Sequence, residues 1–147
     1  MLRLRRMRLR LSVFESRQTA AAVTNSREYA GPPLRVELLW FADCPNHAAA
    51  RGLLSDALGE LAPGTTIDDI DATDPAVALL HRFPGSPTIR INEGDVDPAF
   101  RDPGDYTPRC RLYRTSHGLR ALPERSWIDA ALRAAITGQS GLVTAGR

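Results

Sequence analysis

An apolar segment that ends at a cysteine constrains the fold of this chain more than any other feature of its 147 residues. Residues 34–41 place Val, Leu and Trp on one face of an extended segment and Leu and Phe on the other. Apolar side chains on both faces are typical of a central strand that is covered on both sides. Cys44 follows, and a helical pattern begins behind it. The sequence therefore predicts a thiol at the corner between a buried strand and a helix.

Strand and helix patterns alternate through the rest of the chain. Period-2 or apolar runs predict strands at 34–41, 65–72, 87–92 and 110–115, and apolar stripes at helical spacing predict helices at 46–61, 74–83 and 123–136. Asp74-Pro75 is a favourable helix start, with Asp as N-cap and Pro in the first turn. Glu93-Gly94 is expected to form a turn, and residues 95–108, which contain three prolines, are expected to form a loop. This order predicts a single α/β domain.

The two ends of the chain differ from its middle. Residues 1–33 are expected to form a disordered basic extension, because residues 1–30 carry seven arginines against two acidic residues. The remainder carries twelve arginines against fifteen acidic residues, a net charge of −3. Residues 34–137 form the predicted domain, and the small residues of 138–147 predict a flexible tail. The sharper interpretations of the extension are an arm that binds nucleic acid or an acidic membrane, and an Arg-rich transit-like peptide.

Composition also limits the cellular compartments and the classes of partner that we expect for this chain. Two cysteines are too few for a disulfide framework, no apolar run approaches the ~20 residues of a membrane span, and no secretory signal is evident. We therefore expect a cytoplasmic protein without a membrane partner. We expect no nucleic-acid partner either, because no aromatic residues are interleaved with the N-terminal arginines. No phosphate-binding glycine loop is present, and we expect no cofactor.

The position of Cys44 suits thiol chemistry. A helix N-terminus stabilises a thiolate through free N–H groups and the macrodipole, and Pro45 fits the first helical position because no N–H donor is needed there. The neighbouring carboxylate of Asp43 opposes this effect. The alternative interpretation is that Cys44 is a small buried hydrophobic residue in a loop.

Ser86-Pro87 precedes the predicted strand 87–92, where a proline is compatible with a sheet. The bond between these residues is either cis, selected by the tertiary fold, or the trans bond of an ordinary turn.

Three segments together resemble the thioredoxin-like superfamily: Trp40-Phe41-Ala42-Asp43-Cys44-Pro45-Asn46, Phe83-Pro84-Gly85-Ser86-Pro87-Thr88 and Cys110-Arg111-Leu112-Tyr113. They are especially similar to small bacterial thioredoxin-like proteins that are often labelled alkylmercury lyase. The resemblance covers about residues 34–136. It implies a central mixed four-stranded sheet with helices on both faces. It also implies that Cys44 is the nucleophile, that Pro87 is the cis-proline beside it, and that the backbone of Ser86 pairs with a bound peptide or glutathione.

The chain departs from that family where the second cysteine of the motif is expected. His47 stands there, so a local dithiol cycle is excluded. Three possibilities remain open: Cys110 supplies the second thiol, a small thiol such as glutathione does so, or there is no redox cycle. His47 is either a hydrogen-bond partner of the thiolate or an ordinary histidine on the helix surface.

The favoured function is thus a thiol–disulfide oxidoreductase-type activity acting on a protein disulfide or a low-molecular-weight thiol. Cys44 and Cys110 are the candidate catalytic residues, and Asp43, His47, Ser86 and Pro87 are candidate substrate contacts. One alternative is a non-catalytic binding module for a protein or a soft metal such as mercury or copper(I), which two thiolates and Asp43 would hold. Cleavage of organomercurials is another.

Three groups of charged residues complete the candidates. Arg109, Arg111 and Arg114 flank Cys110 and would favour an anionic partner, or else they point to solvent while Cys110 and Leu112 point inward. His81 and His117 lack ligand spacing and are expected on the surface. Asp68, Asp69, Asp71 and Asp74 are interpreted as a solvated strand edge and a helix cap.

Overall fold

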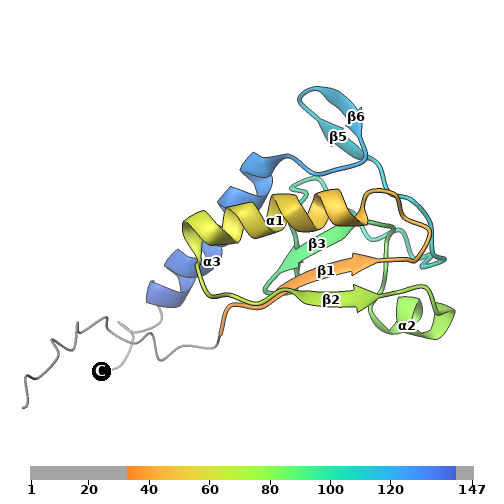
Figure 1. Cartoon of the computed structure of the whole chain (residues 1–147), viewed down its shortest axis with the longest axis horizontal. Helices are drawn as coiled ribbons and strands as arrows, with labels where there is room; N and C mark the ends of the chain where they lie inside the picture. Colours follow the sequence, from red (N-terminus) through yellow and green to blue (C-terminus); the bar gives the residue numbers. More distant parts are fainter. Residues whose placement is uncertain (1–32, 142–147) are drawn as a thin grey trace, which may run out of the picture.

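The computed structural model describes residues 33–141 and contains a four-stranded sheet with helices on both faces (Figure 1). The elements are β1 (Val36–Trp40), α1 (His47–Leu61), β2 (Asp68–Asp71), α2 (Pro75–Leu80), β3 (Thr88–Ile91), β4 (Gly94–Asp95), β5 (Tyr113–Thr115), β6 (Gly118–Arg120) and α3 (Arg125–Gly141). The strand order is β2-β1-β3-β4; β1 runs parallel to β2 and antiparallel to β3, and β4 is antiparallel to β3. The predicted α/β class with a mixed four-stranded sheet is confirmed.

The fourth strand is not the one that the sequence indicated. Gly94–Asp95 pairs with β3 as β4, although residues 95–108 were expected to be a loop. Asn92 and Glu93 both have positive φ, 48° and 70°, which is the backbone of a two-residue hairpin turn; Gly94 is already in the strand. The expected strand at 110–115 instead contributes Tyr113–Thr115 to a separate hairpin with β6, because the chain turns back at once and pairs locally.

One face of the sheet is covered by α1 and α3, which lie side by side in Figure 1. The buried stripe of α1 consists of Ala50, Leu54, Ala57 and Leu58. It packs with Val36 and Leu38 of β1, Ile89 and Ile91 of β3, and Ile128 and Leu132 of α3. This is the larger of the two clusters of buried apolar residues.

The opposite face is covered by α2. Leu39 of β1 packs there with Ala72, Ala78 and Phe83, all of them fully buried. Leu38 and Leu39 therefore lie in different clusters, as expected for consecutive residues of a strand covered on both sides. The expectation of helices on both faces is confirmed.

Several boundaries differ from the predicted ones. The first helix begins at His47, with Asn46 as its N-cap, so Pro45 precedes the helix. Asp74 caps α2 as predicted and accepts a hydrogen bond from the Ala76 N–H at 2.7 Å, but α2 ends at Leu80.

The last helix, α3, continues to Gly141, so residues 138–141, which were predicted to be part of a flexible tail, are helical; the rest of the predicted tail lies outside the described residues. The predicted extension 1–33 lies outside the described residues except for Pro33. No helix within residues 33–141 is long and apolar enough to cross a bilayer.

Candidate functional site

Cys44 lies in the turn between β1 and α1. Its N–H donates to the Phe41 carbonyl at 3.0 Å, which closes the turn, and its side chain is half-buried. The turn is also fastened to the end of β2: the Ala42 N–H donates to Thr73 Oγ1 at 2.9 Å, and the Ala72 N–H donates to the Trp40 carbonyl at 2.7 Å. The prediction of a cysteine at a strand-to-helix corner is confirmed, and the corner is bonded to the residues that follow β2.

The carboxylate of Asp71 is connected to this turn through Thr73. It accepts hydrogen bonds from the Thr73 hydroxyl and, at 2.9 Å, from the Thr73 N–H. These bonds favour the ionised carboxylate and hold the pKa of Asp71 below its ordinary value. Because the same hydroxyl accepts the Ala42 N–H, the charge of Asp71 is coupled to the geometry of the segment before Cys44.

The N-terminus of α1 faces this turn without a side-chain cap. Asn46 is the N-cap residue, but its side chain makes no capping hydrogen bond. The first turn of a helix has N–H groups without partners inside the helix, and these groups favour a nearby anion. Asp43 is exposed, as is Pro45. The feature expected to stabilise a thiolate is therefore present, although Cys44 is separated from the helix by Pro45 and Asn46.

His47 does not contact the thiol within the described part of the chain. Its Nε2 lies 3.0 Å from Asp69 Oδ1, and its ring stacks on the indole of Trp40 with centroids 4.0 Å apart and planes 9° apart. Arg51 holds the other oxygen of Asp69 at 2.9 Å. The side chain of His47 thus joins the start of α1 to β1 and β2, which favours a structural role over the expected bond to the thiolate.

The Ser86–Pro87 peptide bond is cis. Both residues are buried and directly precede β3. Because Leu39 pairs with Thr88, the N-terminal end of β3 meets the C-terminal end of β1, where the Cys44 turn begins. The structure thus places the two motifs at the same end of the sheet. Ser86 Oγ is buried and has no hydrogen-bond partner among the described residues.

The second cysteine is brought to this end of the sheet by a short backbone pairing. The Ser86 N–H donates to the Arg109 carbonyl at 2.8 Å, and the Arg111 N–H donates to the Ser86 carbonyl at 2.9 Å. Cys110 is therefore the residue opposite Ser86 in an isolated parallel bridge. Cys110 is exposed and Leu112 is 63% exposed, so the expectation that both point inward is wrong.

The same pairing bears on the role expected of Ser86. A residue whose backbone accepts a substrate strand needs a free N–H and a free carbonyl. In this chain both groups of Ser86 are bonded to Arg109 and Arg111, and Ser86 is completely buried. The chain itself occupies the position that the resemblance assigned to a bound peptide or glutathione.

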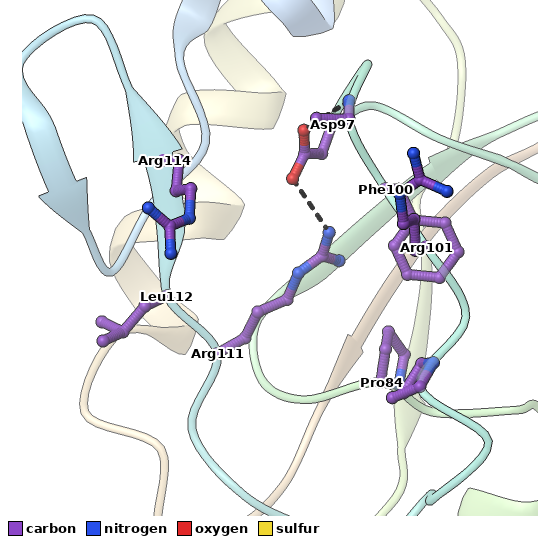
Figure 2. Close-up of a pocket in the computed structure, with 9 residues that line it drawn as sticks. Pro84, Asp97, Phe100, Arg101, Arg111, Leu112 and Arg114 are labelled. Atoms are coloured by element: carbon purple, nitrogen blue, oxygen red, sulfur yellow. Dashed lines mark hydrogen bonds and ion pairs between the residues drawn. The ribbon is translucent and has the colours of Figure 1, made fainter.

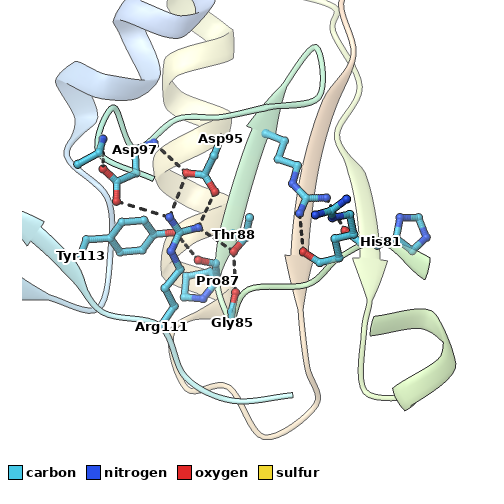
Figure 3. Close-up of polar contacts among 11 residues, drawn as sticks. His81, Gly85, Pro87, Thr88, Asp95, Asp97, Arg111 and Tyr113 are labelled. Carbon is cyan, nitrogen blue, oxygen red and sulfur yellow. Dashed lines mark hydrogen bonds and ion pairs between the residues drawn. The ribbon is translucent and has the colours of Figure 1, made fainter. Parts of the chain in front are cut away.

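Arg111 fastens the paired segment to the sheet (Figure 3). Its guanidinium binds both oxygens of Asp95, at 2.7 and 3.0 Å, and donates to Thr88 Oγ1 at 3.0 Å. It also lies over the rings of Tyr113 and Phe100, 4.3 and 5.1 Å from their centroids. Only 9% of the Arg111 side chain and 2% of the Asp95 side chain are exposed. Arg111 is thus neither solvent-facing nor free to bind an anion, contrary to both expectations.

Burial and charge determine how these groups titrate. Burial lowers the pKa of Arg111, but the hydrogen bonds to Asp95 together with the charges of its neighbours, Asp95 and Asp97 among them, outweigh burial, so the pKa is raised overall. Burial raises the pKa of the Tyr113 phenol well above its ordinary value. The phenol is neutral and donates to the Pro87 carbonyl. Arg111 and Tyr113 therefore hold the segment on both sides of Leu112 against the residues around the cis bond.

A pocket of about 250 Å³ lies beside this segment (Figure 2). Arg111, Leu112 and Arg114 line it together with Phe100 and Arg101, and neither cysteine is part of the lining. Arg109 is elsewhere, paired with Asp105 at 2.9 Å. The three arginines around Cys110 therefore do not form one anion site.

The remaining candidates are the proposed metal ligands and the aspartates around β2, and within the described part of the chain they do not form a metal-binding site. Within residues 33–141, no group of three or more His, Cys, Asp or Glu side chains is arranged to hold a metal ion. The three ligands considered for a soft metal, which are Asp43 and the two cysteines, do not meet as such a group. Asp74 is a helix cap, and β2 is an edge strand of the sheet.

The clamp formed by Arg111, Asp95 and Tyr113 was not predicted from the sequence. Arg and Asp lie 16 residues apart in a loop-like region without periodicity, so no spacing rule connects them. The alternation Cys-Arg-Leu-Tyr was the only signal, and it indicated the wrong face.

Searches for similar proteins returned no match among family models, curated proteins or solved structures.

Proposed function

We propose that this chain is a thioredoxin-like protein that carries out thiol–disulfide exchange with Cys44 as nucleophile and Cys110 as second thiol. The observation that carries the proposal is that both thiol-bearing segments lie at the same end of the sheet. Cys44 lies in the turn after β1, and Cys110 is bridged to Ser86 just before β3, the partner strand of β1. The cis Ser86–Pro87 bond and the sheet with helices on both faces support the thioredoxin-like part of the proposal.

The reaction balances with a disulfide R–S–S–R as the oxidant. The Cys44 thiolate attacks one sulfur of the substrate, forms a mixed disulfide and releases one thiolate. The Cys110 thiolate then attacks the sulfur of Cys44 and releases the second. Two electrons pass from the two protein thiols to the substrate, which leaves as two thiols, and a Cys44–Cys110 disulfide remains. A reducing thiol of the cell would reverse both steps.

The alternative function is a binding module in which the thiols do no chemistry. The buried clamp beside Cys110 and the brace between His47 and Asp69 suit a rigid scaffold of this kind as well. Soft-metal binding and organomercurial cleavage have weaker support, since the described residues contain no three-ligand group. Those two functions would rest on two thiolates alone.

Alkylation kinetics test the proposal directly. The rate of carboxamidomethylation of Cys44 by iodoacetamide would be measured in a Cys110→Ser variant, where Cys44 is the sole thiol, in the folded chain and in the same chain unfolded in urea. We expect Cys44 to react in the folded chain at a rate close to or above that of the unfolded chain, because an attacking thiol must be accessible. A thiol that reacts only after unfolding would favour the binding module.

A matched measurement on Cys44→Ser reports Cys110 alone. Cys110 is exposed, so it should also be alkylated in the folded chain. Faster alkylation of Cys110 than of Cys44 would reverse their roles.

A further inference from the structure

The segment Arg109–Arg111 closes the backbone edge beside Cys44, and this restricts the substrate. An extended polypeptide gains affinity for a sheet by pairing its backbone with a free edge. Along β3 and the residue pair before it, the positions where a peptide could pair are bonded within the chain itself. Ser86 is paired at both its N–H and its carbonyl, the Ile89 carbonyl accepts the Val96 N–H, and β4 pairs with Arg90 and Ile91. Pro87 has no N–H, and its carbonyl accepts the Tyr113 hydroxyl.

The segment also lies too close to the sheet for a second chain to enter between them. Gly85 has a φ of +136°, and a Cβ built on it would lie 2.9 Å from the Cβ of Arg111 and 3.4 Å from the Arg109 carbonyl oxygen. Real side chains do not approach so closely, so the contact requires glycine at position 85. The two backbones are packed directly against each other.

The segment is anchored rather than loosely laid over the edge. Expelling it would withdraw Arg111 from Asp95, whose side chain is 2% exposed, and would leave a buried carboxylate without its partner. It would also break the bond from Tyr113 to Pro87 and the bond from Arg111 to Thr88. A peptide would have to replace all of these contacts with its own backbone pairing.

We propose, on the basis of the proposed function, that the substrate class is small-molecule disulfides and thiols rather than extended polypeptides. A small disulfide needs access to the sulfur of Cys44 and no backbone edge. In this account the chain provides its own strand at the position where a peptide would bind, and that strand carries Cys110 as the second thiol. The chemistry is the exchange described above, with a low-molecular-weight disulfide as oxidant.

The test compares two oxidants with the same leaving group on the full-length protein. Bis(2-hydroxyethyl) disulfide is the small substrate, and the peptide is an unstructured one whose single cysteine carries 2-mercaptoethanol as a mixed disulfide. Each rate is divided by the rate of the same oxidant with N-acetylcysteine, which removes intrinsic reactivity. We expect the normalised rate to be about tenfold higher for the small disulfide, because the peptide gains no backbone pairing and is hindered by the segment.

The outcomes separate this inference from the proposed function. Equal normalised rates, or a faster peptide, would overturn the inference while leaving thiol–disulfide exchange intact. If neither oxidant reacts with Cys44, the proposed function fails and the inference fails with it.

A second measurement does not depend on rates. The amide hydrogens of Ser86 and Arg111 should be protected from exchange with solvent. In the Cys110→Ser variant, where no second thiol can release the peptide, they should stay protected after the peptide is attached to Cys44 as a mixed disulfide. Loss of protection on attachment would show that a peptide displaces the segment, and would overturn the inference. Arg111→Gln should raise the normalised rate of the peptide. Arg109→Gln should leave that rate unchanged, because among residues 33–141 the Arg109 side chain bonds to Asp105 at the surface.

Discussion

Replacing Arg111 by Gln should destabilise the fold far more than the same replacement at Arg109, only two residues away. Arg111 is ion-paired to Asp95 at 2.7 Å and to Asp97 at 3.5 Å, and Arg109 is ion-paired to Asp105 at 2.9 Å, but their surroundings differ. Arg109 is 43% exposed and Asp105 is 61% exposed, whereas the Arg111–Asp95 pair is almost completely buried. The comparison therefore contrasts a buried arginine that has several partners with an exposed one, while the chemical change and the sequence neighbourhood stay the same.

The magnitude follows from what Arg111→Gln leaves behind. Asp95 keeps its charge at neutral pH but loses both guanidinium bonds, and an uncompensated buried charge costs roughly 3–5 kcal/mol. Thr88 Oγ1 loses a donor as well, and the rings of Tyr113 and Phe100 lose the cation above them. In a domain of about 100 residues each kcal/mol corresponds to roughly 4–8 °C in Tm, so the midpoint should fall by at least about 12 °C.

Urea denaturation of the wild type and both variants measures the loss of unfolding free energy. The Asp95→Asn variant completes the design: it should also be destabilised, and the double variant should lose less than the sum of the two single losses, because the charges depend on each other. If Arg111→Gln unfolds at the same urea concentration as Arg109→Gln, the buried clamp does not hold the segment, and the reasoning on edge closure falls with it.

Three further predictions follow from other contacts. Gly85→Ala should destabilise by about 1–3 kcal/mol in urea denaturation because of its positive φ and the Arg111 contact, whereas Gly52→Ala in α1, where the space is open, should stabilise by about 0.5–1 kcal/mol; an equal effect of both would contradict the packing described. Tyr113 has a folded-state pKa raised by burial above its unfolded value, so its contribution to stability is complete below about pH 10 and is lost as the pH rises further. Between about pH 10 and 12, the free energy of unfolding of Tyr113→Phe should therefore fall less steeply with pH than that of the wild type. Identical pH profiles of the two proteins in this range would refute this. The pKa of Asp105 is lowered to about 2, mainly by its hydrogen bonds to Thr107, so the stability it contributes is complete above about pH 5 and declines as the pH falls toward 2; Asp105→Asn should flatten the acid limb of the stability profile, and an unchanged limb would show that this carboxylate has no such role.

The sequence was sufficient to predict the central strand, because apolar residues on both faces of 34–41 leave few arrangements other than a sheet covered on two sides. It also predicted the cap at Asp74, where the signal is local and chemical. It could not predict β4 at Gly94–Asp95, which has two residues and exists only because the turn at Asn92 and Glu93 folds it onto β3. Short strands of this kind depend on tertiary pairing rather than on composition.

In the candidate site, too, some residues could be predicted from the sequence and others could not. Cys44 and Pro87 were predicted from segments that directly adjoin strands, and the structure brings those segments to one end of the sheet. The alternative in which Cys110 and Leu112 point inward is wrong, because the alternation along 110–113 does not produce a single inward face. Arg111 is buried instead, compensated by an aspartate on another strand, and a pairing between distant segments leaves no trace in a single sequence.

The central claim is that two thiols at one end of this sheet act as a pair. Peptide mapping by mass spectrometry after treatment of the full-length protein with one equivalent of bis(2-hydroxyethyl) disulfide tests it most directly. The account predicts a monomer in which the peptides containing Cys44 and Cys110 are joined by a disulfide and no mercaptoethanol is retained. A protein in which Cys44 remains free, or retains mercaptoethanol while Cys110 stays reduced, would contradict the account.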